Sequence, residues 1–129
     1  MPTLTLAQQT LLKNKLLDDL TILKQKVKTR LRISSKEHLK DLVSQIDDMN
    51  ADTLIESLSN VESHSLNRYR EEIKSIDAAL QEMEMGLYGL CSDCEEELNI
   101  DELFSNPAKQ RCTKCEIKYN NQKLKGFPL

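Results

Sequence analysis

The four cysteines of this chain have the spacing of a metal site. They form two Cys-x-x-Cys pairs, Cys91 with Cys94 and Cys112 with Cys115, and seventeen residues separate the pairs. This spacing lies in the range of four-cysteine zinc sites. Two such pairs supply the four thiolates of the tetrahedron that zinc prefers and leave no position for water. The sequence therefore predicts a closed, structural zinc site, with two disulfides as the alternative.

A second group of chemically capable residues is the acidic stretch DDMNAD, which contains Asp47, Asp48 and Asp52. Its turn-forming residues predict that the chain reverses direction here. Residues 46–106 hold sixteen Asp and Glu against three Lys and Arg, residues 1–45 hold nine basic residues against four acidic, and residues 107–129 hold six against one. An acidic middle between basic ends argues against a protein that coats nucleic acid with a continuous basic face.

The composition favours long helices over a globular core. Aromatic residues make up 4% of the 129 residues, Trp is absent, and charged residues make up 30%. Such a composition is typical of amphipathic or coiled helices. No apolar run approaches a membrane span, and the first residues, MPTLTLAQQT, lack the basic and apolar regions of a signal peptide. We therefore expect a cytoplasmic protein, whose thiols stay reduced.

The first predicted helix begins after Thr5, which has the capping-box spacing with Gln8. Its apolar residues recur three or four apart and form one stripe on a helix that reaches about Leu31. The stripe consists of Leu12, Leu16, Leu20, Leu23 and Val27. A break or kink is expected near residues 33–35, where the pattern weakens. It then resumes in a new phase with Leu39, Leu42, Ile46 and Met49.

The strongest periodicity in the chain predicts a coiled-coil helix after the acidic stretch. Its seam residues are alternately three and four apart: Leu66, Tyr69, Ile73, Ile76, Leu80, Met83 and Leu87. A seam this narrow requires a partner helix, and the helical segment before DDMNAD is the nearest candidate. Antiparallel pairing would set Leu87 near Lys15, with arms of about 50 Å. A parallel homodimeric coiled coil is the alternative.

These patterns together predict an all-α protein. A long antiparallel coiled-coil hairpin is expected over residues 1–87, with an acidic tip near 47–52. A small C-terminal four-cysteine zinc-finger module is expected over 88–129, with a short terminal helix over about 112–125. The apolar residues expected to pack around the cysteines are Leu98, Ile100, Leu103 and Phe104.

The cysteine module resembles the zinc finger of the DksA/TraR family. The resemblance rests on GLYGLCSDC from residue 86, on Pro107 and on CTKC from residue 112, about a quarter of the chain. Members of that family are bacterial or phage transcription regulators that bind RNA polymerase. They insert a coiled-coil tip through its secondary channel toward the catalytic magnesium. The resemblance implies the same partner for this chain, a monomeric state, no membrane, and no specific DNA contact of its own.

The resemblance also assigns a role to the acidic stretch. The family's tip carries two aspartates a few residues apart, and Asp48 and Asp52 match them, with Asp47 as the substitute if the register differs. Carboxylates on a stiff arm could perturb the magnesium site of the polymerase or the mobile elements around it.

Several positions depart from the family pattern. Glu95 replaces the glycine that often follows the second cysteine, Asp101-Glu102 replaces a common arginine, and Glu116 replaces a basic residue. Of the basic residues with which DksA-like members bind guanosine tetraphosphate on the polymerase, Arg68 alone has a counterpart here. The resemblance therefore supports polymerase binding more directly than a response to that nucleotide, which is expected only on the polymerase complex.

Two other classes of function stay open. One is a zinc-dependent nucleic-acid-binding protein, which the acids near the cysteines oppose because phosphate contacts dominate such affinity. The other is a coiled-coil scaffold, which a stable dimer would indicate. An enzyme is the least favoured class. Neither His38 nor His64 has partners that suggest a site, and no nucleophile, phosphate loop or open metal position is recognisable.

Overall fold

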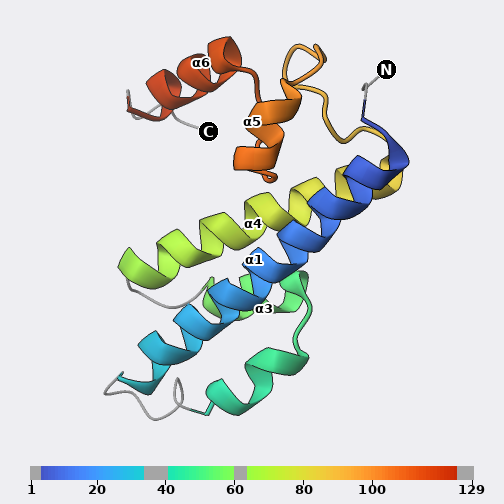
Figure 1. The fold of residues 1–129 in the computed structure, drawn as a ribbon. Coiled ribbons are helices and arrows are strands. Elements are labelled where there is room, and N and C mark those ends of the chain that lie inside the picture. Colours follow the sequence, from blue (N-terminus) through green and yellow to red (C-terminus); the bar gives the residue numbers. More distant parts are fainter. Residues whose placement is uncertain (1–3, 34–40, 60–63, 125–129) are drawn as a thin grey trace.

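The computed structural model describes residues 4–33, 41–59 and 64–124. In this part of the chain the elements are α1 (Leu6–Arg32), η1 (Val43–Asp48, a 3-10 helix), α3 (Ala51–Leu58), α4 (His64–Met85), α5 (Ile100–Ser105) and α6 (Thr113–Leu124) (Figure 1). One isolated β-bridge joins Leu90 to Glu97. The predicted all-α class is confirmed. None of the described helices is both long enough and apolar enough to cross a membrane.

Helix α1 begins with the predicted capping box. The Thr5 Oγ1 accepts a hydrogen bond of 3.1 Å from the Gln8 backbone N–H, and the Gln8 Oε1 accepts one of 2.9 Å from the Thr5 N–H. Both bonds satisfy donors that have no partner within the helix. Four residues of the predicted stripe, Leu12, Leu16, Leu23 and Val27, are buried along one face of α1. Leu20 is partly buried against the same core, and Leu31 at the end of the helix is also buried. The expected break near residues 33–35 lies mostly outside the described residues.

Helix α4 packs antiparallel against α1, and the two form the long hairpin that the seam predicts (Figure 1). The seam residues Leu66, Ile73 and Ile76 are buried, together with Ala79. Tyr69, Leu80 and Met83 are partly buried against the same core. Because one chain buries its own seam in this way, a parallel homodimer is not needed to cover it.

The seam ends at Met83, one seam residue earlier than predicted, because α4 ends at Met85. Gly86 has a φ of 74°, and its N–H donates to the Met83 carbonyl oxygen, while the Leu87 N–H donates to the Glu82 carbonyl oxygen. These two bonds are the Schellman motif, which terminates a helix at a left-handed residue. Leu87 therefore lies beyond α4 and is 48% exposed, so its predicted seam position is wrong.

The segment that joins α1 to α4 folds back along the hairpin. Element η1 packs against α1, and α3 packs against α4. The buried residues of this segment are Ile46, Ala51, Leu54 and Leu58. Residues 47–52 therefore lie beside the paired helices. The sequence had suggested that they form a tip beyond the helices. The physical reason is the apolar stripe of α3, which is shielded from water only when the segment returns to the hairpin.

The cysteine module lies beside the base of the hairpin and touches it at several points. The Lys15 ammonium donates to the Phe104 carbonyl oxygen, and the Gln110 Nε2 donates to the Ser75 carbonyl oxygen over 3.2 Å. Helix α5 lies against the hairpin, and α6 lies farther out (Figure 1). The expected packing residues are present around the cysteines: Leu98 and Leu103 are buried, and Ile100 and Phe104 are partly buried. These contacts set the position of the metal site relative to α4.

Candidate metal centre and acidic segment

The structure brings the four predicted metal ligands together. The Sγ atoms of Cys91, Cys94, Cys112 and Cys115 all lie within 4.8 Å of one another. The Cys94 and Cys112 Sγ atoms are 3.8 Å apart. A tetrahedron with Zn–S bonds of about 2.3 Å has sulfur atoms about 3.8 Å apart. The arrangement therefore suits a tetrahedral zinc ion, and a four-sulfur set leaves no coordination position open for a substrate.

Backbone hydrogen bonds form the two turns that present these sulfur atoms. After the first pair, the Glu95 N–H donates to the Cys91 carbonyl oxygen and the Cys91 N–H donates to the Glu96 carbonyl oxygen. The Ser92 N–H donates to the Gln110 carbonyl oxygen over 2.7 Å and so ties the first turn to the loop before the second pair. The second pair sits at the start of α6. Backbone hydrogen bonds thus hold the first pair of ligands in place and tie it to the chain before the second pair.

Glu95 adopts a backbone conformation that suits glycine. Its φ is 64°, and it is the non-glycine residue with a positive φ in the described part of the chain. The left-handed region costs a residue with a Cβ roughly 1–2 kcal/mol, a cost that glycine does not incur. The glycine expected at this position from the family resemblance therefore has a local structural reason, and Glu95 retains the same turn at a cost.

The thiols have unequal acidities because their surroundings differ. Burial raises the pKa of Cys91, but backbone hydrogen bonds at Cys94, Cys112 and Asp93 outweigh it and lower the value to about 6. Hydrogen bonding to Cys112, and then burial, raise the pKa of Cys115 to about 12. Four adjacent thiols cannot all ionise without a nearby cation, because each thiolate opposes the next. A divalent metal ion would supply that charge.

A hydrogen bond and a cation–π contact brace the module. Tyr88 is buried, and its hydroxyl donates a 2.8 Å hydrogen bond to the Pro107 carbonyl oxygen. Burial, assisted by the charge of Glu82, raises the pKa of Tyr88, so this donor stays protonated. The Arg111 Nε lies 3.0 Å from the Asp93 carboxylate, and its guanidinium carbon lies 4.0 Å from the centre of the Tyr119 ring.

Two lysines of α1 hold the acidic segment against the hairpin. The Lys28 Nζ donates to the Asp47 Oδ2 over 2.8 Å, and the Lys24 Nζ donates to the Met49 carbonyl oxygen over 2.7 Å. The hydrogen bond from Lys28 lowers the pKa of Asp47. Neither lysine was among the predicted site residues. Their spacing of four residues, which places both on one face of a helix, was the available signal.

The three aspartates of the acidic segment have different surroundings. Asp47 is bound to Lys28. Asp52 lies in the first turn of α3 near Asp77 of α4, and burial, followed by a hydrogen bond with Asp52, raises the pKa of Asp77. Asp48 is exposed and forms no ion pair with another described residue. Their predicted role as a group that faces a polymerase stays a prediction.

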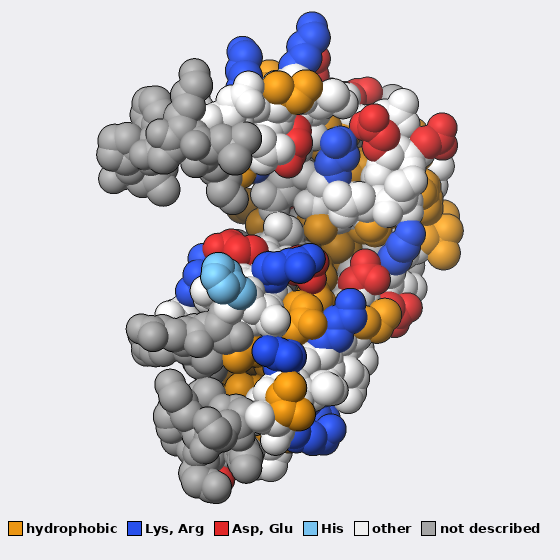
Figure 2. Space-filling model, turned by 90° about the vertical axis from the view of Figure 1, so that its left-hand side faces the viewer, with side chains coloured by type: hydrophobic (Ala, Val, Ile, Leu, Met, Phe, Trp, Pro, Cys, Tyr) orange, Lys and Arg blue, Asp and Glu red, His pale blue; other side chains and the backbone are white. Residues whose placement is uncertain are grey.

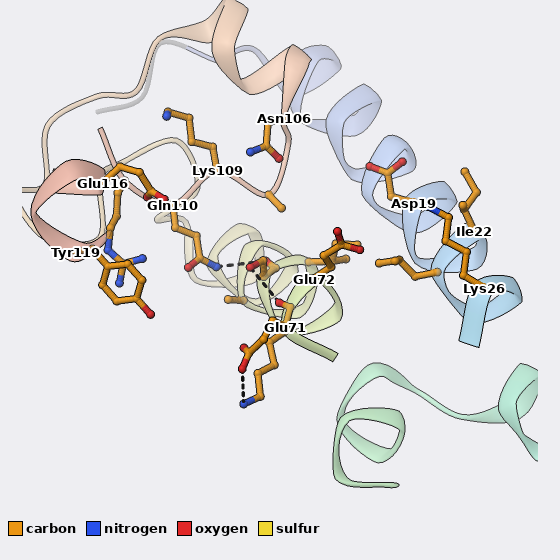
Figure 3. Close-up of a pocket in the computed structure, with 17 residues that line it drawn as sticks. Asp19, Ile22, Lys26, Glu71, Glu72, Asn106, Lys109, Gln110, Glu116 and Tyr119 are labelled. Atoms are coloured by element: carbon orange, nitrogen blue, oxygen red, sulfur yellow. Dashed lines mark hydrogen bonds and ion pairs between the residues drawn. The ribbon is translucent and has the colours of Figure 1, made fainter. Parts of the chain in front are cut away.

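A cavity of about 980 Å³ lies between the cysteine module and the hairpin, beside the contacts that join them. Figure 3 shows its walls: Asp19, Ile22 and Lys26 come from α1, Glu71 and Glu72 from α4, and Lys109, Gln110, Glu116 and Tyr119 from the module. The hydrogen bond from Gln110 to Ser75 crosses one side of it. No periodicity in the sequence could predict this cavity, since it depends on how the module docks.

Comparison with known proteins supports the fold resemblance. The structure of transcription factor DksA2 from Pseudomonas aeruginosa matches 92% of this chain and 87% of its own chain, with a TM-score of 0.57 and 21% sequence identity. The chain therefore has the DksA fold, as its cysteine motif predicted. An uncharacterized protein from Aquifex aeolicus (strain VF5) is 39% identical over 62 residues, which is 48% of this chain and 38% of that protein. No family model matches the sequence.

Proposed function

We propose that this protein is a non-enzymatic transcription regulator that binds bacterial RNA polymerase and enters its secondary channel with the free end of the hairpin. The observation that carries the proposal is the fold, which matches a transcription factor over 92% of the chain and brings four cysteines into one cluster. In this proposal the four cysteines hold zinc, and the ion fixes the module at the base of the hairpin. The proposed regulator acts as a monomer in the cytoplasm.

The hairpin has the shape that entry into a channel requires. Helix α1 has 27 residues, which corresponds to a length of about 40 Å. Its seam with α4 is packed along most of that length. A closed four-cysteine site offers zinc no substrate position, so its contribution is structural. The protein would therefore influence the polymerase by contact and not by chemistry of its own.

The acidic segment would present its carboxylates from the side of this rod. Asp47, Asp48 and Asp52 are all exposed, so each is accessible to a polymerase surface. Asp48 forms no ion pair with the described residues, whereas Asp47 must exchange Lys28 for any new partner. We therefore expect Asp48 and Asp52 to contribute more to regulation than Asp47.

The lifetime of promoter open complexes tests this function. The assay uses the polymerase of the source organism with and without the protein, and the protein is expected to change the lifetime. Asp48→Asn combined with Asp52→Asn should abolish the change but retain binding to the polymerase. The matched control is Asp18→Asn with Glu56→Gln, which removes two exposed acids of α1 and α3. An unchanged lifetime together with no binding to the polymerase would refute the proposal.

The same assay tests whether regulation requires guanosine tetraphosphate. Arg68 is the one residue here that resembles the family's nucleotide-binding residues. We therefore propose that the protein changes the lifetime of open complexes without the nucleotide. Any further effect should arise only when protein and polymerase are both present. A protein that is inactive until the nucleotide is added would contradict this part of the proposal.

A further inference from the structure

Two hydrogen bonds from α1 hold the residues on either side of Asp48. On one side, the Asp47 carboxylate accepts a 2.8 Å hydrogen bond from the Lys28 Nζ. On the other side, the Met49 carbonyl oxygen accepts a 2.7 Å hydrogen bond from the Lys24 Nζ. Asp48 itself is exposed. An exposed carboxylate is thus carried between two neighbours that are both bound to the hairpin.

Apolar contacts hold the rest of the acidic segment on the hairpin. Ile46, Ala51 and Leu54 are buried, and Met49 is partly buried against the same core. Burial of apolar surface is non-directional, so it keeps the segment in place without fixing how its exposed side chains point. Hydrogen bonds depend on angle as well as distance. The two lysine contacts are therefore the ones that can fix the orientation of the turn.

The burial of Lys28 makes its contact with Asp47 durable. The Lys28 side chain is 10% exposed, whereas that of Asp47 is 61% exposed. Loss of the anionic partner would leave a buried positive charge without compensation, which is strongly unfavourable. We therefore expect this contact to stay closed when the outer surface of the segment meets another molecule.

Other positive charges attract the segment over a longer distance. The hydrogen bond from Lys28 lowers the pKa of Asp47 most, and the charges of Lys28, Lys24 and Arg32 lower it further. Figure 2 views this end of the hairpin, and Lys and Arg side chains are spread over its lower part. Such attraction draws an acidic turn toward α1 but does not select one conformation. The hydrogen bonds and the general charge therefore make separable contributions.

We infer that Lys24 and Lys28 are positioning residues, which hold the turn around Asp48 so that its carboxylate is presented in one fixed direction. The inference rests on the proposed function, in which exposed aspartates of this segment act on the polymerase. It adds that regulation requires two lysines whose ammonium groups are used within the protein. A carboxylate that is already held in place binds a partner with a smaller loss of conformational entropy. Without the lysines, Asp48 would remain exposed but would lose that advantage.

Nitrogen-15 relaxation of the free protein tests the positioning. Lys24→Met combined with Lys28→Met removes both hydrogen bonds and retains most of the apolar length of each lysine. The backbone order parameters of residues 47–49 are expected to fall from about 0.85, typical of rigid backbone, to below about 0.6. Arg32→Met removes a positive charge that acts on Asp47 through space. It should leave the order parameters unchanged.

The lifetime of promoter open complexes tests the consequence for regulation. Loss of a hydrogen bond to a charged group changes an equilibrium constant by roughly tenfold to a hundredfold. The double Met variant should therefore lose most of its effect on the lifetime but still bind the polymerase. Lys28→Arg keeps a charged donor for Asp47 and should retain the effect. Lys13→Met combined with Lys26→Met is the matched control, since it removes two exposed positive charges from the same helix.

Three results would overturn the inference. They are unchanged order of residues 47–49 in the double Met variant, wild-type regulation by that variant, and an equal loss of regulation in the control pair. Zinc content and helicity, measured on every variant, separate a displaced turn from a lost fold. A wild-type protein without effect on open complexes would refute the proposed function instead. The order parameters need no polymerase, so they would still decide whether the two lysines position the turn.

Discussion

The Lys28 ammonium lies 2.8 Å from the Asp47 carboxylate, and this contact joins a side chain that is 10% exposed to one that is 61% exposed. Lys24, one turn earlier on the same face of α1, donates to the Met49 carbonyl oxygen. The two bonds anchor the acidic segment within the last turns of α1. They determine which carboxylates remain accessible from outside.

Replacing Lys28 should change the titration of Asp47. The hydrogen bond from Lys28 lowers the pKa of Asp47 below its usual 3.8. A lowered pKa means that the contact stabilises the fold above pH 3.8 and that this contribution disappears as pH falls through the lowered value. We expect Lys28→Met to return the pKa of Asp47 toward 3.8, as measured by NMR of the carboxyl carbon. Lys24→Met is the control and should have a smaller effect. Identical titration in all three proteins would contradict the contact.

Asp77 should behave in the opposite sense. Burial and a hydrogen bond with Asp52 raise the pKa of Asp77. The fold therefore favours the protonated form of Asp77, so stability is greatest below the unfolded-state pKa and declines as pH rises through the raised value. Asp77→Asn should stabilise the protein by a few tenths of a kcal/mol at pH 7, since the site is largely solvated. Denaturant unfolding at pH 4 and pH 7 checks this, and a gain that is equal at both values would refute the electrostatic explanation.

Glycine at position 95 should stabilise the cysteine module. Glu95 has a φ of 64°, which glycine adopts without steric cost. The gain from Glu95→Gly should be about 0.5–1 kcal/mol, after the greater entropy of glycine in the unfolded chain is deducted. Resistance of the zinc-loaded protein to denaturant measures this gain. The neighbouring Glu96→Gly is the matched control and should destabilise, because Glu96 does not have a positive φ. Losses in both variants would show that the turn does not limit stability.

Periodicity predicted the elements whose partners are long and regular. The stripes of α1 and α4 could be paired from sequence because each helix carries one apolar stripe that needs a partner helix, and each is the other's nearest candidate of matching length. Cysteine spacing likewise predicted the four sulfur atoms that the structure brings together. Both signals depend on local sequence patterns, so they can be recognised without knowledge of the tertiary structure.

The acidic segment shows where this reasoning fails. Its turn formers do interrupt the chain, but Asn50 caps a new helix by accepting a 2.8 Å hydrogen bond from the Thr53 N–H. The next apolar residues, Leu54 and Leu58, then draw α3 back to the hairpin. Turn propensity describes a change of direction and does not specify where the following helix packs. The cavity beside the module depends in the same way on how the module docks against α1 and α4, so it could not be predicted either.

Loss of zinc should affect the two parts of the molecule unequally. The cysteine module has few large buried side chains apart from Tyr88, Leu98 and Leu103, whereas the hairpin buries a continuous seam. We expect Cys91→Ser to abolish zinc binding and to open the module, because ligand binding supplies much of its folding free energy. Helicity of α1 and α4 should fall less.

Hydrogen exchange resolves the two parts. Amide protection should disappear at residues 88–116 and persist along α1 and α4. Removal of the metal by a chelator should reproduce the pattern of Cys91→Ser, and restoring zinc should reverse it. Ser92→Ala, beside the ligand but without a sulfur atom, is the control and should retain both metal and protection. If the module keeps its protection after the metal has left, the four cysteines do not support a structural zinc site.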